Sequence, residues 1–154
     1  MLKGDIMMRI AIGADHGGYK LKQGLLGFLK KRRYILKDFG TFSKDSCDYP
    51  QIGYEVAKVV GKGLYQRGIL ICKTGIGMAV VANKVKGVRA ALCDRIDIAR
   101  SSREHNDSNV LVLAANIVSL SKAKKIISVW LSARALGGRH KRRVKQMIEI
   151  DKQR

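Results

Sequence analysis

Short apolar runs alternate along the chain with longer segments in which apolar residues recur every three or four positions. The short runs, such as 68–72, are typical of strands buried on both faces of a sheet. The longer segments, such as 20–31 with Leu21, Leu25, Phe28 and Leu29, are typical of amphipathic helices. The pattern predicts strands over 9–13, 34–39, 68–72, 88–93 and 109–114, and helices over 20–31, 49–62, 76–85, 96–104, 121–136 and 141–151.

This alternation of strand and helix predicts an α/β fold. Because parallel strands are joined by long, usually helical crossovers, we expect a Rossmann-like, doubly wound, five-stranded parallel sheet flanked by helices. We expect a single domain over 1–154, with 1–7 as a short leader. After a hinge at Gly137-Gly138, a basic helix over 139–154 is expected to pack on a partner subunit. Ligands of such sheets bind at the carboxyl ends of the strands, so polar residues that directly follow strands are candidates for a site.

The composition excludes several classes of protein. The apolar runs are far shorter than the roughly 20 residues that a membrane-spanning helix needs, and no segment resembles a secretory signal. The three cysteines, Cys47, Cys72 and Cys93, are odd in number and widely spaced. They are typical of reduced thiols in a cytoplasmic protein, and no pair has the spacing of a zinc site. We therefore expect a cytoplasmic protein without a metal.

The formal net charge of +19 is the least ordinary global feature. Basic residues concentrate over 122–154, where eleven Lys or Arg accompany two acids, Glu149 and Asp151. Such a segment can bind nucleic acid, an anionic surface or a phosphorylated small molecule, or it can be a solvated helix face. Specific nucleic-acid binding is poorly supported, because aromatic residues make up only 6% of the chain and no nucleic-acid-binding motif is present.

The segment Cys72-Lys-Thr-Gly-Ile-Gly77 ends a predicted strand and opens a predicted helix. Glycines there allow backbone N–H groups to converge on a bound oxygen, and the helix start adds positive potential. The same field favours the thiolate of Cys72, which can then act as a base. The ordinary alternative is a buried structural cysteine. The glycine spacing matches neither the ATP-binding nor the NAD-binding loop.

Three other clusters carry candidate chemistry. Asp15 and His16 follow the first predicted strand, where they can bind phosphate or move protons, or can form a turn and helix cap. His105 lies in a predicted connection between a helix and the fifth strand, where capping is an equally ordinary role. Arg139 and Arg143 are four residues apart, so on a helix they share one face that suits a phosphate dianion, or they belong to a generic basic helix end.

Six motifs in chain order resemble the ribose-5-phosphate isomerase B family. They are Ala14-Asp-His-Gly-Gly18, Asp48-Tyr-Pro50, Ile69-Leu-Ile-Cys-Lys-Thr-Gly-Ile-Gly77, Ala82-Asn-Lys84, Arg103-Glu-His-Asn-Asp107 and Gly138-Arg-His140. The resemblance covers nearly the whole chain. The wider family includes galactose-6-phosphate isomerase subunits and allose-6-phosphate isomerases, so a hexose 6-phosphate is the alternative substrate.

The resemblance implies interconversion of ribose 5-phosphate and ribulose 5-phosphate, without metal or cofactor, in the non-oxidative pentose phosphate pathway. It implies a homodimer or homotetramer with sites at the subunit interface. The implied catalytic residues are Cys72 as the base between C2 and C1, His105 as the ring-opening acid–base, and Thr74 as a proton relay. The implied substrate-binding residues are Asp15, His16, Tyr49, Asn106, Arg139 and Arg143, with the backbone of Lys73, Gly75, Ile76 and Gly77 around the enediolate oxygen.

Two positions depart from the family pattern. Lys73 stands where the family usually has glycine, and a lysine there is strained if the backbone needs a positive φ. Its ammonium can instead favour the thiolate of Cys72 or meet an anionic substrate. Asn116 stands where an arginine usually follows the fifth strand in the phosphate site, so one phosphate contact is expected to be weaker or to come from another basic residue.

Overall fold

The computed structural model describes residues 7–154, so most of the expected leader over 1–7 lies outside the described residues. The strands are β1 (Arg9–Ala14), β2 (Ile35–Asp38), β3 (Arg67–Cys72), β4 (Ala90–Leu92) and β5 (Val110–Ala114). The helices are α1 (Tyr19–Lys30), α2 (Tyr49–Gly61), α3 (Ile76–Ala82), α4 (Ile96–Asn106), α5 (Leu120–Ser132) and α6 (Gly138–Lys152). Each strand and helix expected from the pattern is present.

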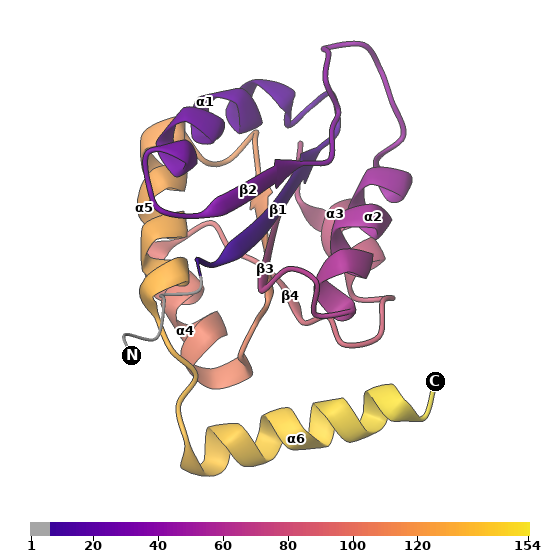
Figure 1. Ribbon diagram of the computed structural model, residues 1–154, viewed down its shortest axis with the longest axis vertical. Coiled ribbons are helices and arrows are strands. Elements are labelled where there is room, and N and C mark those ends of the chain that lie inside the picture. Colours follow the sequence, from indigo (N-terminus) through magenta and orange to yellow (C-terminus); the bar gives the residue numbers. More distant parts are fainter. Residues whose placement is uncertain (1–6) are drawn as a thin grey trace, which may run out of the picture.

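The five strands form one parallel sheet in the order β2-β1-β3-β5-β4. Side chains alternate along each strand, so β1 directs Ile10 and Ile12 to one face and Ala11 to the other. The first face packs on α1, α4 and α5, and the second on α2 and α3. Figure 1 shows these helices on the two sides of the sheet. The expectation of a Rossmann-like, doubly wound α/β fold is confirmed.

Two predicted helix ends are wrong because long-range contacts end the helices earlier. The helix predicted to reach residue 136 ends at Ser132, since Ala133 is extended and the Leu136 N–H donates to the Glu104 carbonyl of α4. The helix predicted to reach residue 85 ends at Ala82. There the Asn83 side chain exchanges two hydrogen bonds with the backbone of Ala90, which anchors it to β4.

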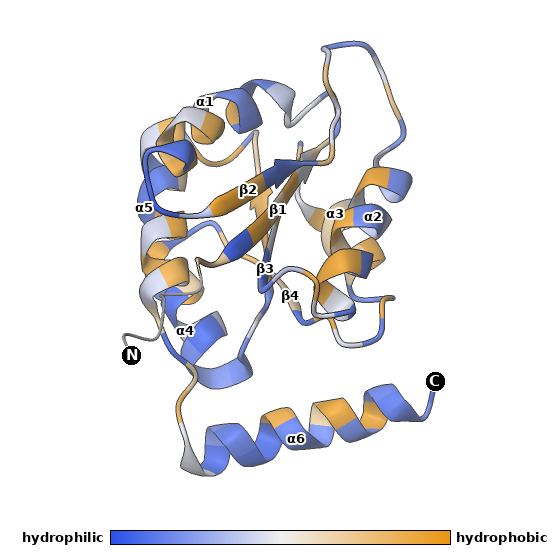
Figure 2. Ribbon diagram, in the orientation of Figure 1, coloured by the Kyte–Doolittle hydropathy of each residue, from blue (hydrophilic) through white to orange (hydrophobic). Residues whose placement is uncertain are grey.

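The last helix begins three residues earlier than predicted, at Gly138, so Arg139 and His140 lie within it. Figure 1 shows α6 apart from the sheet, beyond the end at which β1 begins. The element that α6 mainly contacts is α4. Figure 2 shows that its first half is hydrophilic and that hydrophobic residues gather in its second half. None of the helices in the described range combines the length and the apolar character needed to cross a membrane.

Candidate active site

A cavity of about 480 Å³ opens at the carboxyl ends of β1 and β3. The chain leaves β1 for β2 on one side, and β3 lies on the other side of β1, so this is the point at which the strand order reverses. Open α/β sheets bind ligands at such a point because the loops diverge there. The cavity is lined by Asp15, His16, Tyr49, Cys72, Lys73, Thr74, Ile76, Gly77 and Val80.

Cys72 is the last residue of β3, and its side chain is 5% exposed. The Gly75 N–H donates a hydrogen bond to the Cys72 Sγ over 3.2 Å. Gly75 has φ of 75°, a left-handed conformation that glycine adopts without strain and that directs the chain from this loop into α3. This hydrogen bond fixes the sulfur beside the loop 73–77 at the cavity.

Tyr49 and Thr74 form part of the cavity wall. A Cβ atom added at Gly77 would lie 2.6 Å from Cζ of Tyr49, so the tyrosine ring packs directly on this glycine. The Thr74 Oγ1 accepts a hydrogen bond from the Ile76 N–H over 3.3 Å, which holds the hydroxyl at the start of α3. The contact of Tyr49 with Gly77 thus joins the first turn of α2 to the first turn of α3.

Asp15 serves the local turn and also lines the cavity. Its carboxyl Oδ1 accepts the Gly18 N–H over 3.0 Å. This oxygen therefore has the turn role that the sequence offered as the alternative to a role in the site. His16 accepts the Cys47 N–H at Nδ1 over 3.2 Å. In the neutral ring the proton therefore resides on Nε2, which remains a donor for a ligand. Nothing in the sequence pattern indicates that the Cys47 backbone binds His16.

The two departures from the family pattern are neighbours in the structure. The Asn116 N–H donates to the Lys73 carbonyl over 3.0 Å, and the Ala115 N–H donates to the Cys72 carbonyl over 2.8 Å. Among residues 7–154, the single non-glycine residue with positive φ is Asp107. Lys73 therefore has an ordinary backbone conformation, and the strain considered for it is absent.

Val80 is a lining residue that the sequence analysis missed. It follows Ile76 by four residues on α3, so helical spacing places both side chains on the same face of the helix. Both are exposed, Ile76 by 60% and Val80 by 54%, and Ile117 after β5 is exposed by 60%. The α3 side of the cavity is therefore apolar and exposed, whereas exposed Lys73 and Thr74 line the loop side.

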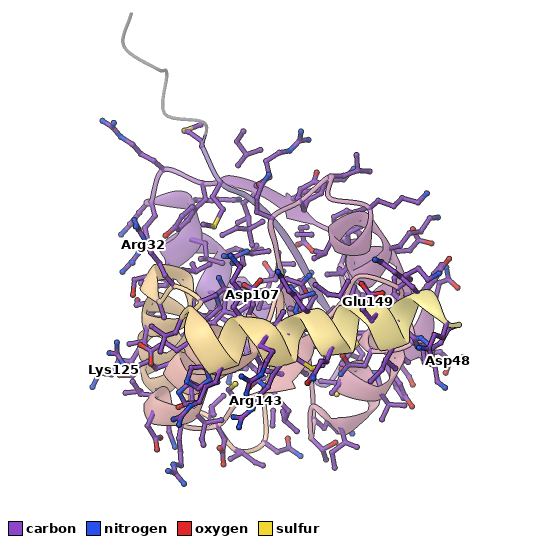
Figure 3. All side chains as sticks on the ribbon, turned by 90° about the horizontal axis from the view of Figure 1, so that it is seen from below. Arg32, Asp48, Asp107, Lys125, Arg143 and Glu149 are labelled. Carbon is purple, nitrogen blue, oxygen red and sulfur yellow. The ribbon has the colours of Figure 1, made fainter. Side chains whose placement is uncertain are left out.

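A second cluster of expected site residues lies at α4 and α6. His105 and Asn106 occupy the last turn of α4 rather than the predicted connection. The His105 ring stacks on His140 of α6, with centroids 4.3 Å apart and an interplanar angle of 7°. Arg139 and Arg143 lie one turn apart on the same helix, and both are exposed. Figure 3 views this end of the molecule, with α6 crossing in front of the body and Arg143 on it.

The charges of this second cluster affect the pKa of His140. Loss of hydration lowers this pKa below its ordinary value, and the charges of His105, Arg139 and Arg143 lower it further, against a smaller opposing effect of Glu104. The positive charges that surround His140 thus disfavour its protonated form. The surroundings of the stacked pair are strongly cationic, which suits an anionic ligand.

Within one copy of the chain, the two clusters lie at opposite ends of the strands of the sheet. Cys72 pairs with Ala114 at the carboxyl end of β5, whereas His105 and Asn106 precede Val110 at its amino end. Five strand residues at about 3.3 Å per residue separate the two ends by more than about 13 Å. Asp15, His16, Tyr49, Thr74 and Asn116 accompany Cys72, and Arg139 and Arg143 accompany His105.

Within residues 7–154, no group of three or more His, Cys, Asp or Glu is placed to hold a metal ion.

Comparison with known proteins places this geometry in a family. The family model described as Ribose/Galactose Isomerase matches residues 10–147. The chain belongs to this family. Ribose-5-phosphate isomerase B of Escherichia coli is 42% identical over 148 residues, covering 96% of this chain and 99% of that protein.

Two solved structures extend the comparison with this isomerase family. Ribose-5-phosphate isomerase B from Clostridium thermocellum is 51% identical with a TM-score of 0.92, covering 95% of this chain and 99% of that one. The enzyme from Mycoplasma genitalium, solved with bound ribulose 5-phosphate, is 39% identical with a TM-score of 0.92, covering 96% and 98%. The fold likeness thus extends over nearly the full length of both chains.

Proposed function

We propose that this protein is an aldose–ketose isomerase that interconverts D-ribose 5-phosphate and D-ribulose 5-phosphate, a step of the non-oxidative pentose phosphate pathway. The observation that carries the proposal is the Cys72 sulfur, which lines the cavity at the strand-order reversal and accepts the Gly75 N–H. Relatives named for this activity support it. The bound ribulose 5-phosphate of the Mycoplasma genitalium enzyme supports the choice of substrate.

The proposed chemistry is a proton transfer between adjacent carbons. The Cys72 thiolate removes the proton from C2 of the open-chain aldose, which gives a cis-enediolate, and the thiol returns a proton to C1. The negative oxygen of the enediolate is held by backbone N–H groups of the loop 73–77, of which those of Gly75 and Ile76 bind the Cys72 sulfur and the Thr74 hydroxyl in this structure. Thr74 relays a proton between the two oxygens, and Asp15, His16 and Tyr49 hold the sugar; their presence in the cavity lining supports these roles.

Ring opening is assigned to a second copy of the chain. Ribose 5-phosphate is mainly a closed furanose, so an acid–base must open the ring before Cys72 can act. We infer that His105 does this from a partner copy, with Asn106 on a sugar hydroxyl and Arg139 and Arg143 on the phosphate. Two observations support the inference: His105 lies at the opposite end of the strands from Cys72 in its own copy, and the apolar side chains of Ile76 and Val80 are exposed beside the cavity.

The first test is turnover of ribose 5-phosphate by the purified protein. We expect ribulose 5-phosphate to form without added metal, and Cys72→Ala to lower kcat by about a thousandfold or more because the base is lost. Cys93→Ala removes a thiol that does not line the cavity and should retain activity. Unchanged turnover in Cys72→Ala, with the circular dichroism spectrum of the wild type, contradicts the assignment of the base.

The alternative substrate is a hexose 6-phosphate on the same scaffold. The side chain of Lys73 occupies part of the cavity mouth, which favours the shorter pentose. Values of kcat/KM for ribose 5-phosphate, allose 6-phosphate and galactose 6-phosphate discriminate between the two. A higher value for either hexose replaces the pentose assignment. Tight, sequence-selective nucleic-acid binding at physiological salt without isomerase activity overturns both.

A further inference from the structure

The side chain of Lys73 crosses the mouth of the Cys72 cavity. It is exposed and lies against the turn that holds His16, because a Cβ atom added at Gly17 would meet the Lys73 Cγ at 2.4 Å and Cε at 3.1 Å. The stem of the lysine is thus packed on the β1–α1 turn. This packing keeps the ammonium on the His16 side of the cavity.

The ammonium of Lys73 is free to bind an anion. Within the described range 7–154, it makes no hydrogen bond and no ion pair. The acid that shares the cavity is Asp15, whose Oδ1 already accepts the Gly18 N–H. Among those same residues, Lys73 is the one Lys or Arg that lines the cavity. A phosphate dianion that enters this cavity meets one fixed positive charge from the copy that supplies Cys72.

The neighbouring loop leaves this part of the mouth without another cation. The Asn116 N–H donates to the Lys73 carbonyl over 3.0 Å, so the two residues are neighbours on adjacent loops. Asn116 carries an uncharged amide, and Ala115 and Ile117 beside it are apolar. The positive charge at this edge of the mouth therefore resides on Lys73 alone in this pair of loops.

We propose that the Lys73 ammonium binds the phosphate group of the substrate and thereby sets substrate affinity. This inference rests on the proposed function and deepens it, because it places a phosphate contact on the same copy as Cys72. Lys73 takes no part in the proton transfer. Its contribution is made in the ground state and the transition state alike, so it lowers KM without raising kcat.

Substitution of Lys73 tests the proposal through the split between KM and kcat. We expect Lys73→Gln to raise KM for ribose 5-phosphate roughly tenfold, the effect of losing one hydrogen bond to a charged group, with kcat within about twofold of the wild type. The inhibition constant of inorganic phosphate should rise in parallel. Lys73→Arg, which retains the charge, should keep both values near those of the wild type.

A relocated charge separates phosphate binding from a structural role. In Lys73→Gln/Asn116→Arg the cation returns to the mouth from the adjacent loop, and KM and the phosphate inhibition constant should recover by at least half of the loss on a logarithmic scale. Lys125→Gln, on α5, removes the same net charge away from the cavity and should leave both values unchanged. If only the global charge mattered, Lys125→Gln would match Lys73→Gln and the proposal would be overturned.

The outcomes distinguish this inference from the proposed function. Wild-type turnover of ribose 5-phosphate, combined with an unchanged KM and phosphate inhibition constant in Lys73→Gln, overturns the inference and leaves the isomerase assignment in place. A fall in kcat at constant KM also overturns it, because Lys73 would then act in the chemistry. If the wild type has no isomerase activity, calorimetric titration with inorganic phosphate decides: equal affinity of wild type and Lys73→Gln overturns the inference.

Discussion

Single side chains at the candidate site serve the local fold and the cavity together. Asp15 closes the turn after β1 with one oxygen, and Cys72 receives the N–H that stabilises the loop after β3. Because such contacts involve residues at most three positions apart, the local sequence was enough to predict where these two residues lie. The stacking of His105 on His140 joins two helices far apart in sequence and was not predictable in this way.

The three thiols are expected to differ in reactivity. Burial raises the pKa of Cys93 to about 11, because the charged thiolate loses its hydration; a hydrogen bond with Ser102 opposes this effect. At pH 8 the thiolate fraction of Cys93 is then about 0.1%. Iodoacetamide followed by mass spectrometry should therefore label half-buried Cys47 and leave Cys93 unmodified.

The pH dependence of this labelling has a defined sign. Because the pKa of Cys93 is raised, its labelling should increase as the pH rises toward 11, whereas in 6 M guanidinium chloride Cys93 should react like the other thiols at pH 8. Equal rates for Cys93 and Cys47 in the folded protein at pH 8 contradict the burial of this thiol.

At the scale of the elements, a buried ion pair holds the segment between β2 and α2. Lys22 of α1 is fully buried, and its Nζ donates to the Asp38 Oδ1 and to the Thr41 carbonyl, each over 2.6 Å. Asp38 also accepts the Gly40 N–H over 2.9 Å. The segment that follows carries the Cys47 N–H to His16, so this ion pair helps to shape the cavity wall.

Breaking this pair should destabilise the protein. We expect Lys22→Met to lower the free energy of unfolding by about 3 kcal/mol, because Asp38 is left without its cation. Urea denaturation followed by circular dichroism measures the change. Lys30→Met, at an exposed position of the same helix, should have an effect within about 0.5 kcal/mol.

A double variant separates the ion pair from simple packing. Lys22→Met/Asp38→Asn removes both charges, and it should recover part of the stability lost in Lys22→Met because no unpaired carboxylate remains. A Lys22→Met protein with the denaturation midpoint of the wild type would show that the pair does not stabilise the fold.

The whole molecule presents two clusters of candidate site residues at opposite ends of the strands of one sheet. Exposed Ile76 and Val80 lie beside the cavity with Cys72, and the cluster with His105, Arg139 and Arg143 carries the positive charge that suits a phosphate. A two-fold dimer would bring the first cluster of one copy against the second cluster of the other and would repeat the contact by symmetry. We therefore expect each complete site to combine residues of two copies.

Mixing two inactive variants tests this arrangement. Cys72→Ala and His105→Ala should each lose most activity toward ribose 5-phosphate. When the two are unfolded together in equal amounts and refolded, half of the dimers are mixed and each mixed dimer contains one intact site, so activity should return to about one quarter of the wild type. The double variant Cys72→Ala/His105→Ala, refolded with an equal amount of wild type, is the control: shared sites leave no intact site in a mixed dimer and one quarter of the activity remains, whereas unshared sites retain one half. If the mixture stays inactive although size-exclusion chromatography shows dimers, the site is not shared.

The pattern of apolar residues was enough to predict the alternation of strands and helices, and with it the loops that meet at the carboxyl ends of the strands. Apolar periodicity is local, and the crossover rule then makes the sheet parallel, so Asp15, His16 and Cys72 were predictable as neighbours. Contacts between distant segments place β5 between β3 and β4 and His105 away from Cys72, end α5 at Ser132, and bind the Asn116 N–H to the Lys73 carbonyl. Each of these features depends on contacts between residues that are distant in the chain, and the apolar periodicity within one segment does not predict such contacts.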